Sequence, residues 1–332
     1  MTLLQTLLRS TAYRTPLLRT LVPTLALSYG IQGAVAAPSI AGQTERFYDL
    51  SGSLTYISCT ALSLALPFLR ARAASNGALT LGEYLSAPAP GQGGWWWRHA
   101  VLSLAVGVWA GRLGSFLFKR ISEDKSDSRF DNIRVSPPKF LVAFFAQATW
   151  VSLCLLPVIS LNSLPRSAFA VSRLTTSLTT PVSAKPYWTD VLGLAMFVFG
   201  LAFEATADRE KSQWSKEKRE KKHSEEFLTR GLWSKSRHPN YFGEITLWSG
   251  IAIAAGGLLV KNSAQVGLGL GGIGGKVLVA SMCAASPAFV AFLLLKVSGI
   301  PMSEGKYDKK FGDRKDYQRW KEETPMLVPK LW

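Results

Sequence analysis

The chain has 332 residues, of which 48% are hydrophobic and 18% are charged, and its formal net charge is +16. Such a charge in a soluble chain would suggest a nucleic-acid partner, but here the Lys and Arg residues lie between long apolar blocks. The composition therefore argues against an ordinary soluble domain. It favours a membrane protein with basic loops and no nucleic-acid partner.

The apolar blocks are each close to the ~20 residues that an α-helix needs to cross a bilayer. They predict an all-α, polytopic integral membrane bundle with six or seven transmembrane helices. The count is six or seven because the second block is short and the first block contains Pro23. Either of these two segments could therefore lie in the membrane interface instead of crossing the bilayer. The predicted spans are 17–37, 54–69, 99–118, 140–160, 190–207, 244–260 and 277–297.

The first 44 residues contain three arginines, many Ser and Thr residues and no acid. This pattern is typical of a targeting segment, and the small residues Ala34–Ala37 resemble a cleavage site. The alternative is a first membrane helix that is preceded by basic residues. With seven spans the N-terminus would lie on the lumenal side, where arginines are disfavoured, and cleavage of residues 1–44 or loss of an early span would remove that conflict.

Residues 45–98 form an N-terminal membrane region, which ends in a Pro- and Gly-rich connector at 86–98. The three tryptophans of this connector, Trp95–Trp97, favour an anchor at the membrane interface. The Ser/Thr-rich stretch 161–186 predicts a lumenal loop. The rest of the chain, residues 99–332, forms the second predicted domain.

Metal chemistry is not indicated. The three cysteines occur singly in apolar segments, and the three histidines are far apart in the sequence, so neither set has the spacing of a zinc site or a disulfide framework. These residues are Cys59, Cys154, Cys283, His99, His223 and His238.

The segments 208–240 and 302–332 both carry more Lys and Arg than Asp and Glu. The positive-inside tendency places both on the cytosolic side, and the number of intervening spans places loop 119–139 there too. Two acids, Glu204 and Asp208, end the fifth predicted span on one helical face. Carboxylates at membrane depth need cations, hydrogen-bond donors or a water-filled cavity, unless both simply lie in the headgroup layer.

The segment Gly231–Glu244 crowds polar groups at the start of a membrane helix. Pro239 disfavours helix at the preceding residue, so a helix should begin near Asn240 with free N–H groups that attract anions. The side chains of Arg237, His238, Asn240, Tyr241 and Glu244 offer donors and acceptors that suit a nucleotide. The alternative is an ordinary interfacial turn.

Several separated motifs occur in order from about residue 100 to the end. They are Trp109–Gly114 followed by Asp127–Asp131, then Glu204–Asp208, Ser236–Glu244, Val297–Pro301 with Glu304, and the tail Tyr317–Pro329. Together they resemble membrane proteins related to the C-terminal domain of steroid 5-alpha-reductases, in a domain-of-unknown-function branch that is also related to isoprenylcysteine methyltransferases. Trp320 stands where a tyrosine is usual, which disfavours a hydroxyl role there.

The resemblance implies that NADPH binds between the cytosolic loops and the last helices, and that hydride passes to a carbon–carbon double bond of a lipid or sterol-like substrate. By motif transfer, Glu204 and Asp208 would hold the nicotinamide or ribose. The other implied cofactor residues are Arg237, His238, Asn240, Tyr241 and Glu244 at the helix start, Arg314, Tyr317, Arg319 and Trp320 in the tail, and, as a loop contribution, Arg120, Asp127 and Arg129. No residue identifies the proton donor.

Two other classes stay open. An S-adenosylmethionine-dependent membrane methyltransferase would share the turn after Arg237 and a similar tail, and a non-catalytic membrane protein could retain the fold. The resemblance favours the endoplasmic reticulum, whereas the basic N-terminus allows a mitochondrial membrane. The sequence does not predict the oligomeric state.

Overall fold

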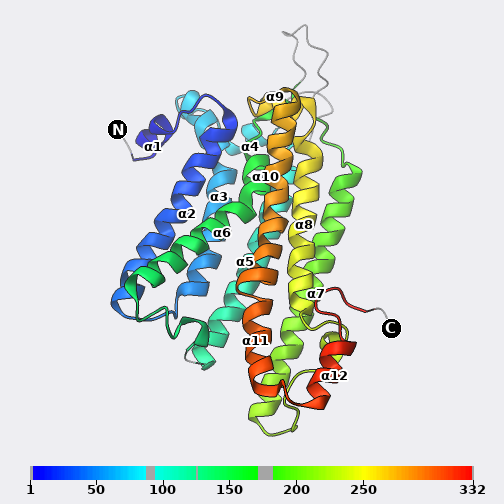
Figure 1. The fold of residues 1–332 in the computed structure, drawn as a ribbon. Helices are drawn as coiled ribbons and strands as arrows, with labels where there is room; N and C mark the ends of the chain where they lie inside the picture. The colour runs from blue at the N-terminus through cyan, green and yellow to red at the C-terminus, as the bar shows by residue number, and fades with distance from the viewer. Residues whose placement is uncertain (1–2, 87–93, 125, 171–181, 331–332) are drawn as a thin grey trace. The chain divides into compact units, whose positions relative to one another are not determined.

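The computed structural model describes residues 3–86, 94–124, 126–170 and 182–330 (Figure 1). This part of the chain is helical and contains no β-strand. Most of the predicted connector 86–98, and much of the predicted loop 161–186, lie outside the described residues. The α-helices are α1 (Leu3–Ser10), α2 (Pro16–Ala41), α3 (Tyr48–Ala74), α4 (Leu81–Leu85), α5 (Trp97–Asp124), α6 (Pro137–Asn162), α7 (Trp188–Arg219), α8 (Pro239–Leu259), α9 (Asn262–Gly267), α10 (Gly272–Phe292), α11 (Ile300–Phe311) and α12 (Lys315–Glu323).

Seven helical segments of the described chain are long and apolar enough to cross a membrane. Each contains or overlaps one predicted span, so the prediction of a polytopic helical membrane protein is confirmed. The short block 54–69 lies within α3, which has 27 residues, and Pro23 lies inside α2. The seventh segment, Gly272–Phe311, joins α10 to α11 through a π-helical turn at Leu293–Val297.

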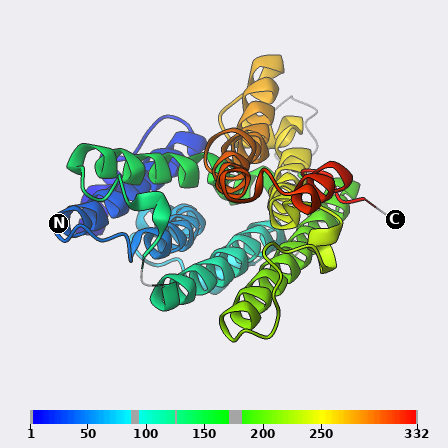
Figure 2. The same cartoon turned by 60° about the horizontal axis from the view of Figure 1, so that its bottom comes forward.

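The chain divides into two compact units. Unit 1 contains Met1–Asp190 and Ala254–Ala285, and unit 2 contains Val191–Ile253 and Ser286–Trp332. In unit 1, α2 packs against α3 and α6, and α3 also packs against α5; Figure 2 shows α2, α3 and α6 as neighbours.

Buried polar side chains join these helices of unit 1. Gln147 Nε2 donates to Gln32 Oε1 (3.0 Å) and to Ser51 Oγ (3.1 Å), and Gln32 Nε2 donates to Thr55 Oγ1 (2.7 Å). We call these four residues the α2–α3–α6 polar cluster. Such bonds hold helices together where the surrounding lipid offers no hydrophobic driving force.

The N-terminal segment is fastened to the same unit by Arg70 of α3. Its guanidinium donates to the carbonyls of Leu8 (2.9 Å), Thr11 (3.1 Å) and Arg19 (3.0 Å). Gln32, which also belongs to the first 44 residues, is part of the α2–α3–α6 polar cluster. Residues 16–41 therefore form a packed helix in this structure, while cleavage of the segment stays a prediction.

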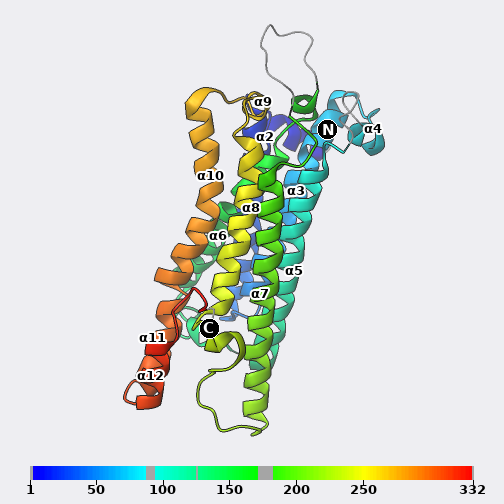
Figure 3. The ribbon, with the colours of Figure 1, turned by 90° about the vertical axis from the view of Figure 1, so that its right-hand side faces the viewer.

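In unit 2, α7 and α8 lie side by side (Figure 3) and approach each other through glycines. A Cβ atom at Gly200 would lie 2.6 Å from the carbonyl of Gly243, and one at Gly243 would lie 2.7 Å from the backbone nitrogen of Glu204. Gly250 meets the carbonyl of Gly193 in the same way. Small residues let membrane helices come close, and here they bring the middle of α7, at Glu204, against the first turns of α8.

Candidate functional site

The turn before α8 is held by its own side chains and by the C-terminal tail. The helix begins at Pro239, as the sequence predicts. Ser236 Oγ accepts a hydrogen bond from the backbone N–H of His238 (3.1 Å) and donates to the carbonyl of Leu327 (2.8 Å). The turn and the tail therefore fix each other.

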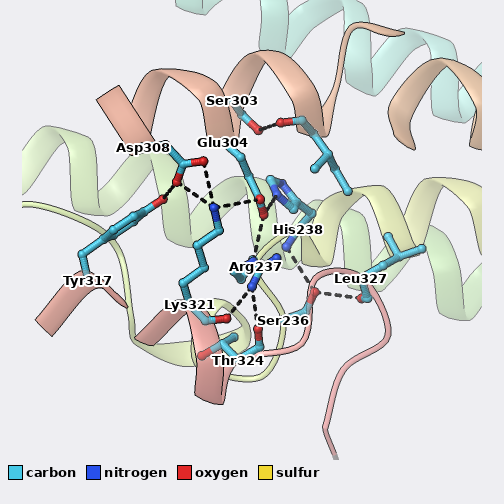
Figure 4. A network of polar contacts seen from close by, with 11 residues as sticks. Ser236, Arg237, His238, Ser303, Glu304, Asp308, Tyr317, Lys321, Thr324 and Leu327 are labelled. Carbon is cyan, nitrogen blue, oxygen red and sulfur yellow. Dashed lines mark hydrogen bonds and ion pairs between the residues drawn. The ribbon is translucent and has the colours of Figure 1, made fainter. Parts of the chain in front are cut away.

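Arg237 is the main link between this turn and the tail (Figure 4). Its Nε donates to Glu304 Oε1 at 2.8 Å, and its Nη1 donates to the carbonyls of Lys321 and Thr324. Its backbone N–H donates to the carbonyl of Pro325 at 2.9 Å. The guanidinium proposed from the sequence as a cofactor ligand is thus already engaged in joining α8, α11 and α12.

Glu304, in the first turns of α11, makes hydrogen bonds and ion pairs with several residues. Besides Arg237, it has His238 Nε2 at 3.2 Å from Oε1 and Lys321 Nζ at 3.5 Å from Oε2. Lys321 also pairs with Asp308 (2.7 Å), which accepts the hydroxyl hydrogen bond of Tyr317 (2.8 Å). The sequence prediction did not include Glu304 among the site residues, although it lies three residues after Pro301 in a quoted motif.

His238 is buried against Tyr241, with ring centroids 5.2 Å apart and an interplanar angle of 2°. Burial lowers the pKa of His238 to about 4, although the hydrogen bond and the negative charge of Glu304 act in the opposite direction. The imidazole is therefore neutral near pH 7.

The two acids at the end of the fifth predicted span lie inside α7 and are buried. Asn240 Nδ2 donates to Asp208 Oδ1 at 3.4 Å, so the structure brings one of these acids to the start of α8. Glu204 lies one turn earlier on α7, where its backbone packs against Gly243. Glu244 is half-buried in α8.

A partly open cavity lies between α7, the turn before α8, α11 and α12. Its volume is about 50 Å³. Six predicted residues line it: Arg237, His238, Asn240, Tyr241, Tyr317 and Trp320. The sequence prediction missed the other lining residues, which are Lys211, Trp214, Phe227, Leu228, Trp233, Ser303, Glu304 and Tyr307.

The aromatic walls of this cavity are held in place by hydrogen bonds and stacking. Trp233 Nε1 donates to the carbonyl of Ala207 (3.0 Å), and Trp214 Nε1 donates to Glu225 Oε2 (2.8 Å). Lys211 Nζ lies 4.9 Å from the centre of the Trp233 ring. The sequence gives no signal for these tryptophans beyond their being aromatic residues in the charged segment 208–240.

Two polar atoms of the lining residues have no hydrogen-bond partner among the described residues. They are the acceptor Asn240 Oδ1 and the donor Trp320 Nε1, and both atoms are buried. Buried polar atoms are normally paired in folded proteins, and each exception calls for a partner. The cavity thus offers one acceptor and one donor beside flat aromatic rings.

The two predicted tail arginines are not among the lining residues. Arg314 pairs with Asp316 (2.6 Å) and Arg319 with Glu323 (2.7 Å), and both arginines are exposed. The Arg314 guanidinium also lies over Phe227, a cavity residue, at 5.8 Å. Exposed ion pairs are weak, so these acids do not hold the two arginines firmly. The implied role of Arg314 and Arg319 as cofactor residues stays a prediction.

The predicted loop contribution, Arg120, Asp127 and Arg129, belongs to unit 1. Arg129 pairs with Asp127 (2.7 Å) and Asp49 (3.3 Å), and Arg120 lies 3.5 Å from Asp127. Burial raises the pKa of Asp127, but the hydrogen bond and charge of Arg129 outweigh it and hold that pKa below its usual value. These residues satisfy one another, and a contribution to the cofactor stays a prediction.

Unit 2 therefore has a small cavity lined by aromatic rings, in a polytopic helical membrane protein. The family described as "Protein of unknown function (DUF1295)" matches residues 74–324, and the chain belongs to this family. No curated protein and no solved structure matches the chain.

Proposed function

We propose that the protein is an NADPH-dependent reductase of a carbon–carbon double bond in a lipid or sterol-like substrate. The observation that carries the proposal is the pair of buried, unpartnered atoms in the cavity of unit 2, Asn240 Oδ1 and Trp320 Nε1. The carboxamide of nicotinamide has an NH₂ group to donate and a carbonyl to accept, so it complements this pair.

The surroundings of the two atoms suit a flat ring. Tyr241, Trp233 and Tyr307 line the cavity with aromatic faces, on which a nicotinamide or adenine ring can stack. Asp208, bonded to Asn240, is a carboxylate of the type that accepts ribose hydroxyl groups. The cofactor would supply the hydride, while these side chains would bind and orient it.

The resemblance to the steroid 5-alpha-reductase C-terminal domain supports the same assignment. It names Asn240, Tyr241 and Tyr317 as cofactor residues from motifs alone, and all three line the cavity. The cavity volume of about 50 Å³ is smaller than the ~300–1,000 Å³ that is typical of small-molecule sites. We therefore expect the walls to move apart when the cofactor enters, as the helix break at Leu293–Val297 would permit.

The charge of the lining residues favours NADPH over S-adenosylmethionine. Lys211 and Arg237 face the cavity against the single carboxylate Glu304, and His238 is neutral. Lys211 already occupies a position over the Trp233 ring. A sulfonium cation would be repelled there, whereas the reduced nicotinamide ring is uncharged.

Binding by cavity variants tests the proposal. Trp320→Phe keeps the ring and removes the N–H donor, and Asn240→Ala removes the acceptor. If each atom makes one hydrogen bond to the cofactor, each change should weaken NADPH binding by about 3–10-fold in a fluorescence titration. Lys315→Gln, on the same helix as Trp320 but exposed and outside the cavity lining, is the matched control and should leave the affinity unchanged.

The reaction itself is tested by comparing lipid extracts of cells with and without the protein. A reductase predicts substrate and product that differ by two hydrogens. A methyltransferase predicts a methylene difference instead, and a non-catalytic protein predicts no shift. Either of the last two results would overturn the proposal.

A further inference from the structure

Unit 1 contains a second group of buried polar residues, separate from the α2–α3–α6 polar cluster. Asn162 at the end of α6 donates through Nδ2 to Ser63 Oγ of α3 (2.9 Å) and to Ser103 Oγ of α5 (3.1 Å). Thr60 lies three residues before Ser63, and His99 four residues before Ser103, so each shares a helical face with its neighbour. We call these five residues the α3–α5–α6 polar cluster.

This cluster differs from the first in its hydrogen bonding. Both ring nitrogens of His99, Oδ1 of Asn162 and Oγ1 of Thr60 are buried and have no hydrogen-bond partner in the described part of the chain. The three residues are only 5%, 1% and 4% exposed. The backbone carbonyls of Trp96, Leu161 and Leu164 lie close enough to the His99 ring to act on it electrostatically. By distance and angle, however, neither ring nitrogen makes a hydrogen bond to a described residue.

The α2–α3–α6 polar cluster shows that this unit can pair its buried polar groups. None of the side-chain atoms of Gln32, Ser51, Thr55 or Gln147 is among the buried unpartnered atoms of the described residues. An unpaired buried polar group destabilises the fold, and inside a membrane protein polar groups that persist are commonly functional. The contrast indicates that the second cluster has a partner outside the chain.

Apolar and aromatic side chains surround the second cluster. Trp95 and Phe169 contact the His99 ring, with centroid distances of 5.6 and 6.0 Å. Leu66, Val106 and Val158 are buried one turn from Ser63, Ser103 and Asn162 respectively. A small-molecule site usually has mostly apolar walls and a small number of polar groups that point toward the ligand.

The charge nearby is already neutralised. Arg98 precedes His99, but its guanidinium donates to Asp190 (2.8 Å) and to the carbonyls of Ser183 (2.9 Å) and Lys185 (2.6 Å). The cluster itself contains no carboxylate, lysine or arginine. A charged headgroup would therefore lack a counterion, whereas a neutral group would not need one.

We propose that the α3–α5–α6 polar cluster binds the hydroxyl group of a neutral lipid alcohol, whose hydrocarbon part lies against the apolar walls. A hydroxyl group donates one hydrogen bond and accepts others. It can donate to Asn162 Oδ1 and accept from an N–H of the His99 ring. This site lies in unit 1 and does not depend on the cofactor proposed for unit 2.

Photolabelling of the full chain in lipid nanodiscs tests the proposal without any mutation. The probe is a diazirine-bearing hexadecanol, compared with its methyl ether, which cannot donate a hydrogen bond. We expect the alcohol to label peptides containing Thr60–Leu66 and His99–Val106 about fivefold or more above the ether. Equal labelling by the two probes would mean that the cluster does not recognise a hydroxyl group, and the proposal would be wrong.

Two variants separate a ligand site from a structural one. His99→Phe should abolish the preference for the alcohol yet leave the unfolding temperature without probe unchanged or higher, because it removes two unpartnered atoms. Gln147→Leu, in the α2–α3–α6 polar cluster, should lower that temperature by several degrees and keep the preference. If His99→Phe is as destabilising as Gln147→Leu and leaves labelling unchanged, the histidine has a structural role only and the proposal fails.

Discussion

Each unit gathers arginines and acids, but with different results. In the ion cluster of unit 1, Arg129 bonds Asp127 and Asp49, and Arg134 bonds Glu45 at 3.0 Å. In unit 2, Arg237 and Glu304 are bonded just as fully, yet the adjoining cavity retains two unpartnered atoms. The comparison shows that the ion pairs of both units are internally satisfied. The proposed ligand of unit 2 would therefore use the two unpartnered atoms and not the paired charges beside them.

The largest effect is expected at Arg237. Arg237→Met removes the donors to Glu304, Lys321 and Thr324, which leaves a partly buried carboxylate and two carbonyls without this partner. Breaking a buried pair in this way costs about 3 kcal/mol of unfolding free energy. NADPH binding should also be lost, because Arg237 holds together the cavity wall formed by the turn before α8, α11 and α12. Denaturant unfolding and limited proteolysis of the tail measure the change.

The exposed Lys315→Met is the control for that experiment, because Lys315 lies on α12, as Lys321 does, and is not among the cavity lining residues. Its stability and affinity should match the wild type. An Arg237→Met protein as stable as this control, with an intact tail, would show that the guanidinium is not the link described.

The next effect is a pH dependence of stability from His238. Its folded-state pKa is about 4, lowered by burial, whereas an unfolded histidine has a pKa near 6.5. Between these values the unfolded state binds more protons, so stability should fall as pH decreases from about 6.5 to 4, by about 2 kcal/mol. The loss of stability should be smaller in His238→Phe, measured by unfolding at each pH, and identical pH profiles would contradict the burial argument.

The smallest effect is expected in the ion cluster of unit 1. The double variant Asp127→Asn, Arg129→Gln removes three partly exposed pairs, Arg129–Asp127, Arg129–Asp49 and Arg120–Asp127, and should cost about 1 kcal/mol of stability. NADPH affinity should stay unchanged in the same titration that detects Trp320→Phe. A tenfold loss of affinity would instead support the loop contribution expected from the sequence, and would erase the difference between the two units.

Sequence reasoning succeeded where the signal is local. Block lengths near 20 apolar residues predicted the spans, and Pro239 predicted the start of α8. It also selected Asn240, Tyr241 and Tyr317, which line the cavity. The spans and the helix start depend on spacing within one segment, which the sequence displays directly. Tyr317, in contrast, was implied by the resemblance of the tail motif.

The remaining features depend on contacts between distant segments. Glu304 reaches Arg237 and His238 across more than sixty residues of chain, so its role could not be read from its neighbours. The walls formed by Trp214 and Trp233 depend on how the loop after α7 folds back. The hydrogen bonds from Arg237 to the carbonyls of Lys321 and Thr324 could not be predicted either, because any residue type can supply a backbone acceptor.

The most direct test of the central claim is equilibrium titration of the purified, detergent-solubilised chain with NADPH and, separately, with S-adenosylmethionine. The account predicts saturable NADPH binding in the micromolar range, weakened by Trp320→Phe and Asn240→Ala, and no competing binding of S-adenosylmethionine. Wild-type protein that is indifferent to NADPH, or that binds S-adenosylmethionine in preference, would contradict it.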